Sequence, residues 1–313
     1  MIHAAAARLA GHAVVTPMLE HPALNAIAGR RVLVKAECLQ RTGSFKFRGA
    51  WNAVAAQSTA TGYIAYSSGN HAQGVALAAQ LHGKSCVIVM PSDAPGVKIA
   101  NTRGYGAEVV LYDRRNDDRE AIGSKIATEH GLTLIRPYDD ALVIAGQGTT
   151  GLEIAAQAGV TDAEVITCCG GGGLTSGIAL ALQGTRLRVR PAEPAGYDDV
   201  TRSLAAGMIL RNDGAAPTVC DAIMTPEPGQ ITFPILSRLC GPGLVVTDDQ
   251  ACHAVALAFK HLRIVLEPGG AVALAASLFQ SDDLSEDTVI CTASGGNVDV
   301  DLFQTILARF GKT

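Results

Sequence analysis

The chain has 313 residues, of which 48% are hydrophobic and 17% charged, and it carries a net charge of −4. This length predicts two domains, and the absence of Lys and Arg blocks argues against sequence-independent binding of nucleic acid, which needs a basic face. The longest apolar runs, such as 75–81 and 271–278, are shorter than the ~20 residues that span a membrane. The N-terminus lacks the basic start and apolar centre of a secretory signal, so we expect a cytoplasmic protein without membrane contact.

Short β-branched segments alternate with alanine-rich segments along the chain. The predicted strands are 32–37, 62–66, 85–90, 108–111, 164–169, 187–192 and 288–292. The predicted helices include 70–81, 117–130, 148–158, 175–183, 248–262, 271–279 and 298–310. This alternation predicts an α/β fold with a mostly parallel sheet and helices on both of its faces. In such sheets ligands bind where strands end and helices begin, so those turns are the candidate sites.

Residues 41–50, RTGSFKFRGA, place one lysine between two phenylalanines at the start of a further helical pattern. If Ser44 caps that helix, its buried stripe consists of Phe47, Ala50, Trp51 and Val54. Lys46 then lies beside small residues at 49, 50 and 53, which leave room for a flat group. Apolar surroundings lower the pKa of a lysine, and a neutral amine is what Schiff-base chemistry needs. The alternative is a solvated lysine at a helix start.

Residues 66–74, YSSGNHAQG, follow a predicted strand and open a predicted helix. They place two hydroxyls, a glycine, an amide and an imidazole within five positions, and with the free N–H groups of a helix start these suit a carboxylate. A catalytic hydroxyl is also compatible with this turn. The alternative is ordinary helix capping by Ser68 or Asn70.

Residues 168–177, CCGGGGLTSG, also lie between a predicted strand and a predicted helix. Four successive glycines leave backbone N–H groups free to surround an anion, and a helix N-terminus favours negative charge, so this turn predicts a phosphate site. The run fits no G-x-G-x-x-G register, although Glu193 follows Gly173 by 20 residues, as a ribose-binding acid would in a nicotinamide enzyme. It also lacks the lysine of an ATP-binding P-loop.

Residues 292–299, TASGGNVD, form a third turn after a strand and place the hydroxyl of Ser294 beside glycines. The eight cysteines include no C-x-x-C pair, and most lie in apolar runs. We therefore expect buried free thiols in a reducing compartment rather than disulfides or a zinc site.

Four segments in combination resemble one branch of the pyridoxal-phosphate (PLP) enzymes, the serine/threonine dehydratases and serine racemases of the tryptophan-synthase-β fold type. These segments are QRTGSFKFRGA, SSGNHAQG, GGGGL and SGGNVD, which extend from residue 40 to residue 299. The resemblance implies a fold type II PLP enzyme with two open, mostly parallel sheets and the cofactor between a large and a small domain. It also implies a homodimer, a large domain of residues 1–51 and 141–313, and a small substrate domain of residues 52–140.

The resemblance assigns roles position by position. Lys46 would hold the cofactor as a Schiff base and then act as the base for the Cα proton. The expected cofactor-binding residues are Phe45, Lys46, Asn70, Gly170, Gly171, Gly172, Gly173, Leu174 and Ser294. The expected substrate-carboxylate residues are Ser67, Ser68, Asn70 and His71, and Ser68 also stands where the branch has an acid/base serine on the second face of the substrate.

The resemblance also indicates a divalent-cation site at Glu193, Asp199 and the carbonyl of Tyr197, a donor set that suits Mg²⁺. The alternative is a solvated acidic loop. Arg119 resembles a position at the distal end of the substrate and could meet a second carboxylate, or it could form a surface ion pair. Ala222 stands where the branch usually has glycine, near the cofactor edge, so its methyl group is expected to reshape the substrate pocket.

These observations predict a PLP-dependent elimination of water from a β-hydroxy amino acid, with L-threonine or L-serine as substrate and a 2-oxo acid and ammonia as products. A serine or aspartate racemase is an alternative, because Lys46 and Ser68 would supply a base on each face. A 3-hydroxyaspartate ammonia-lyase is another. Outside this branch, the alternatives are a nicotinamide dehydrogenase and a small-ligand sensor that needs no reactive lysine.

Overall fold

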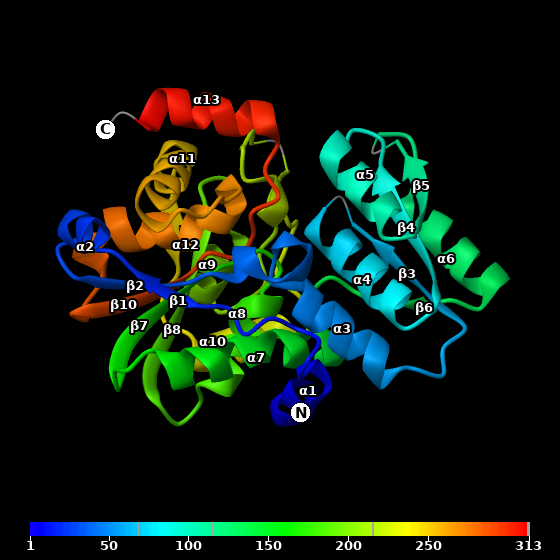
Figure 1. The fold of residues 1–313 in the computed structure, drawn as a ribbon, viewed down its shortest axis with the longest axis horizontal. Helices are drawn as coiled ribbons and strands as arrows, with labels where there is room; N and C mark the ends of the chain where they lie inside the picture. Colours follow the sequence, from blue (N-terminus) through cyan, green and yellow to red (C-terminus); the bar gives the residue numbers. More distant parts are fainter. Residues whose placement is uncertain (68, 114, 215, 312–313) are drawn as a thin grey trace.

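The larger of two β-sheets forms the centre of the larger lobe, on the left in Figure 1. The computed structural model describes residues 1–311 apart from 68, 114 and 215. The six-stranded sheet has the order β1-β2-β10-β7-β8-β9. Its strands are β1 (Met18–Glu20), β2 (Arg31–Lys35), β7 (Asp162–Cys168), β8 (Arg186–Pro194), β9 (Leu244–Val246) and β10 (Thr288–Thr292). Only the edge strand β1 pairs antiparallel, and the other strands of this sheet pair parallel.

The second sheet lies in a separate lobe, on the right in Figure 1. It is parallel throughout and has the order β5-β4-β3-β6. Its strands are β3 (Gly62–Tyr66), β4 (Ser85–Pro91), β5 (Glu108–Tyr112) and β6 (Thr133–Leu134). All four strands fall inside residues 52–140, the predicted small domain, and those boundaries stay a prediction.

Helices cover both sheets (Figure 1). The helices before residue 140 are α1 (Ile2–Leu9), α2 (Pro22–Ala28), α3 (Lys46–Ala56), α4 (Asn70–Leu81), α5 (Gly96–Gly104) and α6 (Arg119–His130). The later helices are α7 (Ala141–Gln157), α8 (Gly173–Ala181), α9 (Asp199–Ala206), α10 (Thr232–Leu239), α11 (Asp248–Leu257), α12 (Pro268–Phe279) and α13 (Val300–Phe310). Short 3-10 turns are η1 (Glu37–Leu39), η2 (Arg41–Gly43), η3 (Asp221–Ile223) and η5 (Ser281–Asp283), and η4 (Ala258–Leu262) is a π-helical turn.

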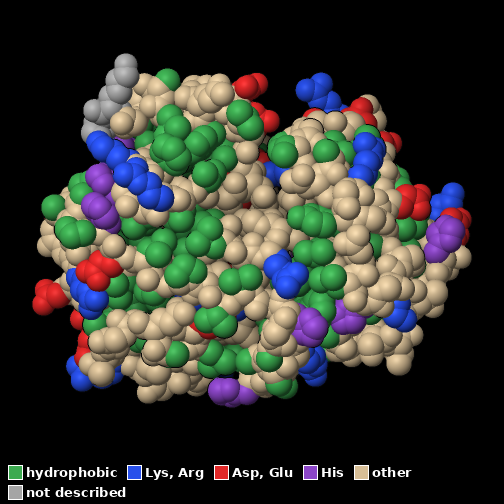
Figure 2. Space-filling model, in the orientation of Figure 1, with side chains coloured by type: hydrophobic (Ala, Val, Ile, Leu, Met, Phe, Trp, Pro, Cys, Tyr) green, Lys and Arg blue, Asp and Glu red, His purple; other side chains and the backbone are tan. Residues whose placement is uncertain are grey.

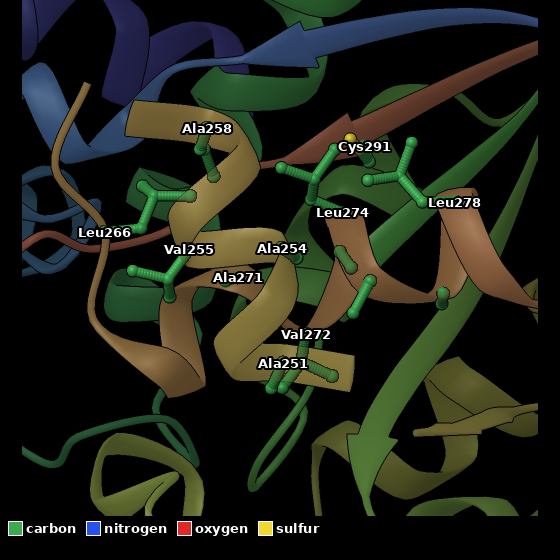
Figure 3. Packing of buried hydrophobic residues seen from close by; sticks show 14 of the residues in the cluster. Ala251, Ala254, Val255, Ala258, Leu266, Ala271, Val272, Leu274, Leu278 and Cys291 are labelled. Atoms are coloured by element: carbon green, nitrogen blue, oxygen red, sulfur yellow. The ribbon is translucent and has the colours of Figure 1, made fainter. Parts of the chain in front are cut away.

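The main core lies between the large sheet and helices α11 and α12. Residues 268–278 of α12 are all buried, which accounts for the absence of a polar face in this part of the sequence. Figure 3 shows α12 side chains such as Val272 and Leu274 packed against α11 and against Cys291 of β10. The backbones of α7 and α8 are in close contact at two glycines. A Cβ at Gly177 would lie only 2.6 Å from the backbone nitrogen of Gly148.

The predicted α/β class is confirmed, and most predicted elements exist with ends displaced by a few residues. The 62–66 strand and the 70–81 helix have the predicted bounds. The short strands β1, β6 and β9 were not predicted, since two or three residues carry no readable alternation. Helix α7 begins seven residues before its predicted start, at a cap that Asp140 provides by accepting from the N–H groups of Leu142 and Val143. The predicted helix 248–262 ends its α-helical part at Leu257 and continues as the π-turn η4.

Ser44 does not cap α3, contrary to the sequence prediction. Phe45 occupies the cap position without a side-chain hydrogen bond, and Ser44 instead pairs with Gly295 in an isolated antiparallel bridge. Tertiary pairing with the 292–299 turn therefore determines where the helix begins. The buried stripe is confirmed, since Phe47, Ala50, Trp51 and Val54 are all buried.

All eight cysteines are free, and only Cys240 is partly exposed, as expected for reduced core thiols. Within the described residues, no helix has both the length and the apolar composition needed to cross a membrane. On the face drawn in Figure 2, Lys and Arg side chains are scattered among hydrophobic ones.

Candidate active site

The three glycine-bearing turns meet at the carboxyl ends of the parallel strands. The Phe45 N–H donates to the Ser294 carbonyl at 3.1 Å, and the Gly296 N–H donates to the Gly43 carbonyl at 2.9 Å. These bonds fasten the lysine-bearing segment to the turn that follows β10. The glycine turn after β7 and the turn after β3 face the same space, because residues of all three turns line one pair of cavities.

Lys46 lies where the two cavities adjoin. The larger cavity measures about 380 Å³ and the smaller about 50 Å³, and Lys46 and Asn70 line both. The Lys46 amine donates to the Pro137 carbonyl at 2.9 Å and lies 5.2 Å from the centre of the Phe45 ring. Loss of hydration lowers the pKa of Lys46 to about 8, so a substantial fraction of the amine is neutral in mildly alkaline solution. The structure thus places Lys46 beside open space with a lowered pKa, while its role in binding a cofactor stays a prediction.

The glycine turn encloses the smaller cavity and has the form of an anion cradle. No backbone N–H of residues 170–174 donates to another residue within the described part of the chain. Helix α8 begins at Gly173, so its positive end faces this cavity. A side chain at Gly173 would crowd Tyr138, since its Cβ would lie 2.9 Å from the Tyr138 Cβ. Free donors, a helix end and a bare backbone fit a phosphate group. Leu174 and Ser294 also line this cavity.

Asn70 begins helix α4, and its side-chain amide is held at both ends. Its Nδ2 donates to Glu267 Oε1 at 2.5 Å, and its Oδ1 accepts from Asn297 Nδ2 at 2.7 Å. The second hydrogen of Asn70 Nδ2 is left for another acceptor. Since Asn70 lines both cavities, that acceptor can be a group bound beside Lys46.

The turn after β3 places Ser67 and His71 on the larger cavity. His71 is buried, and its Nε2 lies 2.9 Å from the Ile135 carbonyl. Burial, together with the charge of Lys46, lowers the pKa of His71 to about 3, so the ring is neutral. A neutral ring that donates through Nε2 has only an acceptor left at Nδ1, so its contact with a carboxylate would come from the backbone N–H. Ser68, the expected second-face residue, lies outside the described residues.

Charged side chains line the larger cavity, and most of the acidic ones are engaged. The charged residues are Lys46, Lys98, Arg119, Glu120, Arg136, Asp139, Asp221 and Glu227. Asp139 accepts from the backbone at the start of α10, Asp221 pairs with Lys98, and Glu227 pairs with an arginine outside the cavity. Salt bridges offset the charges of Asp221 and Glu227, whereas Asp139 keeps its negative charge, which the N–H groups at the start of α10 stabilise.

Arg119 is the first residue of α6 and lines the larger cavity, and its contact with a substrate carboxylate stays a prediction. Arg136, on the segment between β6 and α7, lines the same cavity and was not predicted. Within the described residues, no hydrogen bond or ion pair engages the side chain of Arg119, Arg136 or Glu120. Two guanidinium groups on this cavity are therefore available to a bound carboxylate.

Glu193, near the end of β8, and Asp199, the first residue of α9, lie close together. Both are fully buried, and Glu193 accepts from the N–H groups of Val200 and Thr201 at 2.9 and 2.6 Å. Burial raises the pKa of Glu193 to about 8 and that of Asp199 to about 6. Asp199 Oδ1 accepts from Asn212, whereas its buried Oδ2 has no partner. An unpartnered buried carboxylate oxygen fits a cation, although the described residues include no cluster of three His, Cys, Asp or Glu side chains. The side chain of Tyr197 is buried nearby.

Sequence reasoning missed four residues at the site: Lys98, Arg136, Asp221 and Glu267. Glu267 precedes Pro268 at the start of α12, and the predicted helix began only at residue 271. An acidic residue before a proline is an N-terminal helix signal that could have drawn notice to Glu267. The single basic residue Lys98 carries no comparable local signal. Ala222 lines both cavities, as expected for a position near the cofactor edge.

Known proteins share this fold. The chain matches the family described as pyridoxal-phosphate dependent enzyme over residues 9–295. It is 42% identical over 308 residues to an L-threo-3-hydroxyaspartate ammonia-lyase of Pseudomonas sp, which covers 97% of this chain and 96% of the relative. It is 37% identical over 313 residues to a serine racemase of Schizosaccharomyces pombe, and the match covers 98% of this chain and 96% of the racemase. The crystal structure of a threonine deaminase from T.th. has a TM-score of 0.90 and 44% identity, with 95% and 97% covered.

One mostly parallel and one parallel sheet, with a lysine and a glycine cradle between them, define the class of fold type II PLP enzymes. The chain belongs to the pyridoxal-phosphate dependent enzyme family. The resemblance inferred from the four sequence segments is thereby confirmed. Family membership makes PLP, rather than a nicotinamide dinucleotide, the cofactor of this chain. The relatives include both ammonia-lyases and racemases.

Proposed function

We propose that this protein removes water from an L-β-hydroxy amino acid, L-threonine or L-serine, and releases a 2-oxo acid and ammonia. The observation that carries the proposal is the place of Lys46, whose amine lies between a phosphate-sized cradle and a cavity of about 380 Å³. The similarity to ammonia-lyases over nearly the whole chain supports the same reaction class.

PLP supplies the electron sink that makes the Cα proton of the substrate acidic. We assign Gly170–Leu174 to its phosphate, Phe45 and Asn70 to its ring and 3-hydroxyl, and Ser294 to its ring nitrogen. Lys46 would hold the cofactor through its amine, and the free amine would accept the Cα proton of the substrate, a role that its lowered pKa suits. Ser294 would place a neutral hydroxyl beside the ring nitrogen, which would favour loss of the β-hydroxyl.

The substrate carboxylate has its donors at the start of α4. We assign this role to Ser67, Ser68, Asn70 and His71, with His71 acting through its backbone N–H because its ring is neutral. Ser68 is assigned from the family resemblance as the acid/base on the second face, which would also permit racemisation of serine or aspartate.

A second candidate substrate is 3-hydroxyaspartate, which the charges of the larger cavity favour. Arg119 and Arg136 line it without a hydrogen-bond or ion-pair partner among the described residues, so both guanidinium groups are available there. A substrate with a second carboxylate would neutralise these guanidinium groups, and Arg–carboxylate pairs are strong and directional. The 42% identical L-threo-3-hydroxyaspartate ammonia-lyase supports the same candidate.

We further propose that Glu193, Asp199 and the Tyr197 carbonyl bind Mg²⁺. The unpartnered Asp199 Oδ2 supports this role, and two carboxylates with one carbonyl leave positions for the waters that Mg²⁺ retains. A homodimer, expected from the family resemblance, is likewise a proposal.

The test is a screen for 2-oxo acid release from L-serine, L-threonine, L-threo-3-hydroxyaspartate and their D-enantiomers, with and without Mg²⁺. Lys46→Ala is expected to abolish release, whereas Lys125→Ala, at an exposed lysine on α6, is expected to retain it. Unchanged turnover in Lys46→Ala would refute the mechanism. Arg136→Met is expected to lower kcat/KM for hydroxyaspartate by about tenfold or more and to leave serine almost unaffected, because each ~1.4 kcal/mol changes the rate tenfold. Equal losses on both substrates would reject the acidic substrate.

A further inference from the structure

An ion cluster of buried Lys98, buried Glu267 and exposed Asp221 links the two lobes beside the active site. Lys98 lies on α5 in the small lobe, and Asp221 and Glu267 lie on η3 and at the start of α12 in the large lobe (Figure 1). The Lys98 amine lies 2.7 Å from Asp221 Oδ2 and 3.3 Å from Glu267 Oε2. Only 2% of Lys98 and 1% of Glu267 are exposed. Gly69 leaves room for the lysine, since a Cβ there would lie 3.0 Å from Lys98 Cδ.

Glu267 connects this cluster to the amide of Asn70. One carboxylate oxygen of Glu267 faces Lys98, and the other accepts from Asn70 Nδ2 at 2.5 Å. Asn297 donates to the other end of the amide. The two contacts require opposite ends of Asn70, so they select one of its two amide orientations. In that orientation Nδ2 keeps one N–H for another acceptor, and Asn70 lines the same cavity as Lys46.

The ionised state of Glu267 depends on the positive charge of Lys98. Burial alone would lower the pKa of Lys98, but the carboxylates of Glu267 and Asp221 outweigh it and keep the amine charged. Burial raises the pKa of Glu267, and the charge of Lys98 opposes that rise. Without Lys98, Glu267 would be a buried carboxylate with no cation beside it among the described residues, and it would take up a proton. A protonated carboxyl can turn and donate, so it no longer selects the orientation of Asn70.

We propose, given the role assigned above to Asn70 at the cofactor 3-hydroxyl, that Lys98 is a positioning residue. Its docking onto Glu267 and Asp221 joins the small lobe to the large one and holds Asn70 in the orientation that donates to the 3-hydroxyl. The contact between the lobes and the binding of the cofactor ring are therefore coupled through one carboxylate.

The test compares the binding of PLP and of 3-deoxypyridoxal phosphate, which lacks the 3-hydroxyl, to cofactor-free protein by absorbance titration. The expected result for Lys98→Met is about tenfold weaker binding of PLP, the size of one hydrogen bond of ~1.4 kcal/mol, and unchanged binding of the 3-deoxy analogue. Lys98→Arg is expected to restore most of the loss. Glu267→Gln reaches the same carboxylate independently and covers the case in which Lys98→Met does not fold. The double variant is expected to bind PLP no more weakly than the weaker single variant, because both changes act on one contact.

A matched control is the buried pair between Arg190 and Glu164, at 3.3 Å inside the large lobe. Arg190→Met is expected to lower the melting temperature and leave both affinities unchanged. An equal loss of affinity for PLP and for the 3-deoxy analogue in Lys98→Met, or additive losses in the double variant, would overturn the proposal. If the parent protein binds PLP but releases no 2-oxo acid, the proposed function fails, while the affinity comparison still decides the role of Lys98.

Discussion

Replacing His71 with asparagine is expected to make the protein less sensitive to acid. The folded ring has a pKa of about 3, against an ordinary value of 6.5, because it is buried and lies near the charge of Lys46. The unfolded chain therefore binds more protons than the folded one between these values, and stability present above the unfolded pKa is lost as the pH falls. When the pH falls from about 7 to about 5, this single ring lowers the free energy of unfolding by about 2 kcal/mol, because each unit of pH below the unfolded pKa contributes ~1.4 kcal/mol.

The assay is urea unfolding of the parent and of His71→Asn at both pH values, followed by circular dichroism. Other groups titrate in this range, so the quantity of interest is the difference between the two proteins in their loss of stability. We expect the parent to lose about 2 kcal/mol more than the variant. His3→Asn, at an exposed residue of α1, serves as the control and is expected to behave like the parent. If His71→Asn loses as much stability as the parent, the ring is not held neutral, and the assignment of carboxylate binding to its backbone N–H loses its basis.

Three further outcomes are expected. Chelation of divalent cations is expected to lower the melting temperature of the parent but not of Asp199→Asn, and identical shifts would argue against a cation at Glu193 and Asp199. Arg48→Met, which strips a buried cation from its carboxylate partners, is expected to cost about 3–5 kcal/mol in denaturant unfolding, and a cost below about 1 kcal/mol would contradict the pairing. Gly171→Ala is expected to weaken PLP binding about tenfold, ~1.4 kcal/mol, because its methyl group would collide with the Tyr138 ring. If Gly171→Ala binds PLP as tightly as the parent in an absorbance titration, the Tyr138 ring moves aside without weakening the site, and the prediction is wrong.

The turns of the site could be predicted because their chemistry is local. A hydroxyl or glycine cluster after an apolar strand marks the carboxyl end of a strand in a parallel sheet, and Lys46, Asn70, Gly170–Gly173 and Ser294 all line one cavity between the two sheets. Their family roles followed from the four segments in combination. The capping role proposed for Ser44 was wrong, since a bridge to Gly295 outweighs the local capping preference.

By itself, the sequence determined the α/β class, the buried stripe of α3 and the family, because periodicity, turn chemistry and motif order are written in neighbouring residues. The tertiary structure alone decided which distant charges share one space. Lys98 and Glu267 are 169 positions apart and lie in different lobes, yet they meet through a salt bridge at 3.3 Å. The protonation of His71 likewise depends on atoms packed around it by other segments. Burial and long-range pairing set these energies, and neither is encoded at the residue itself.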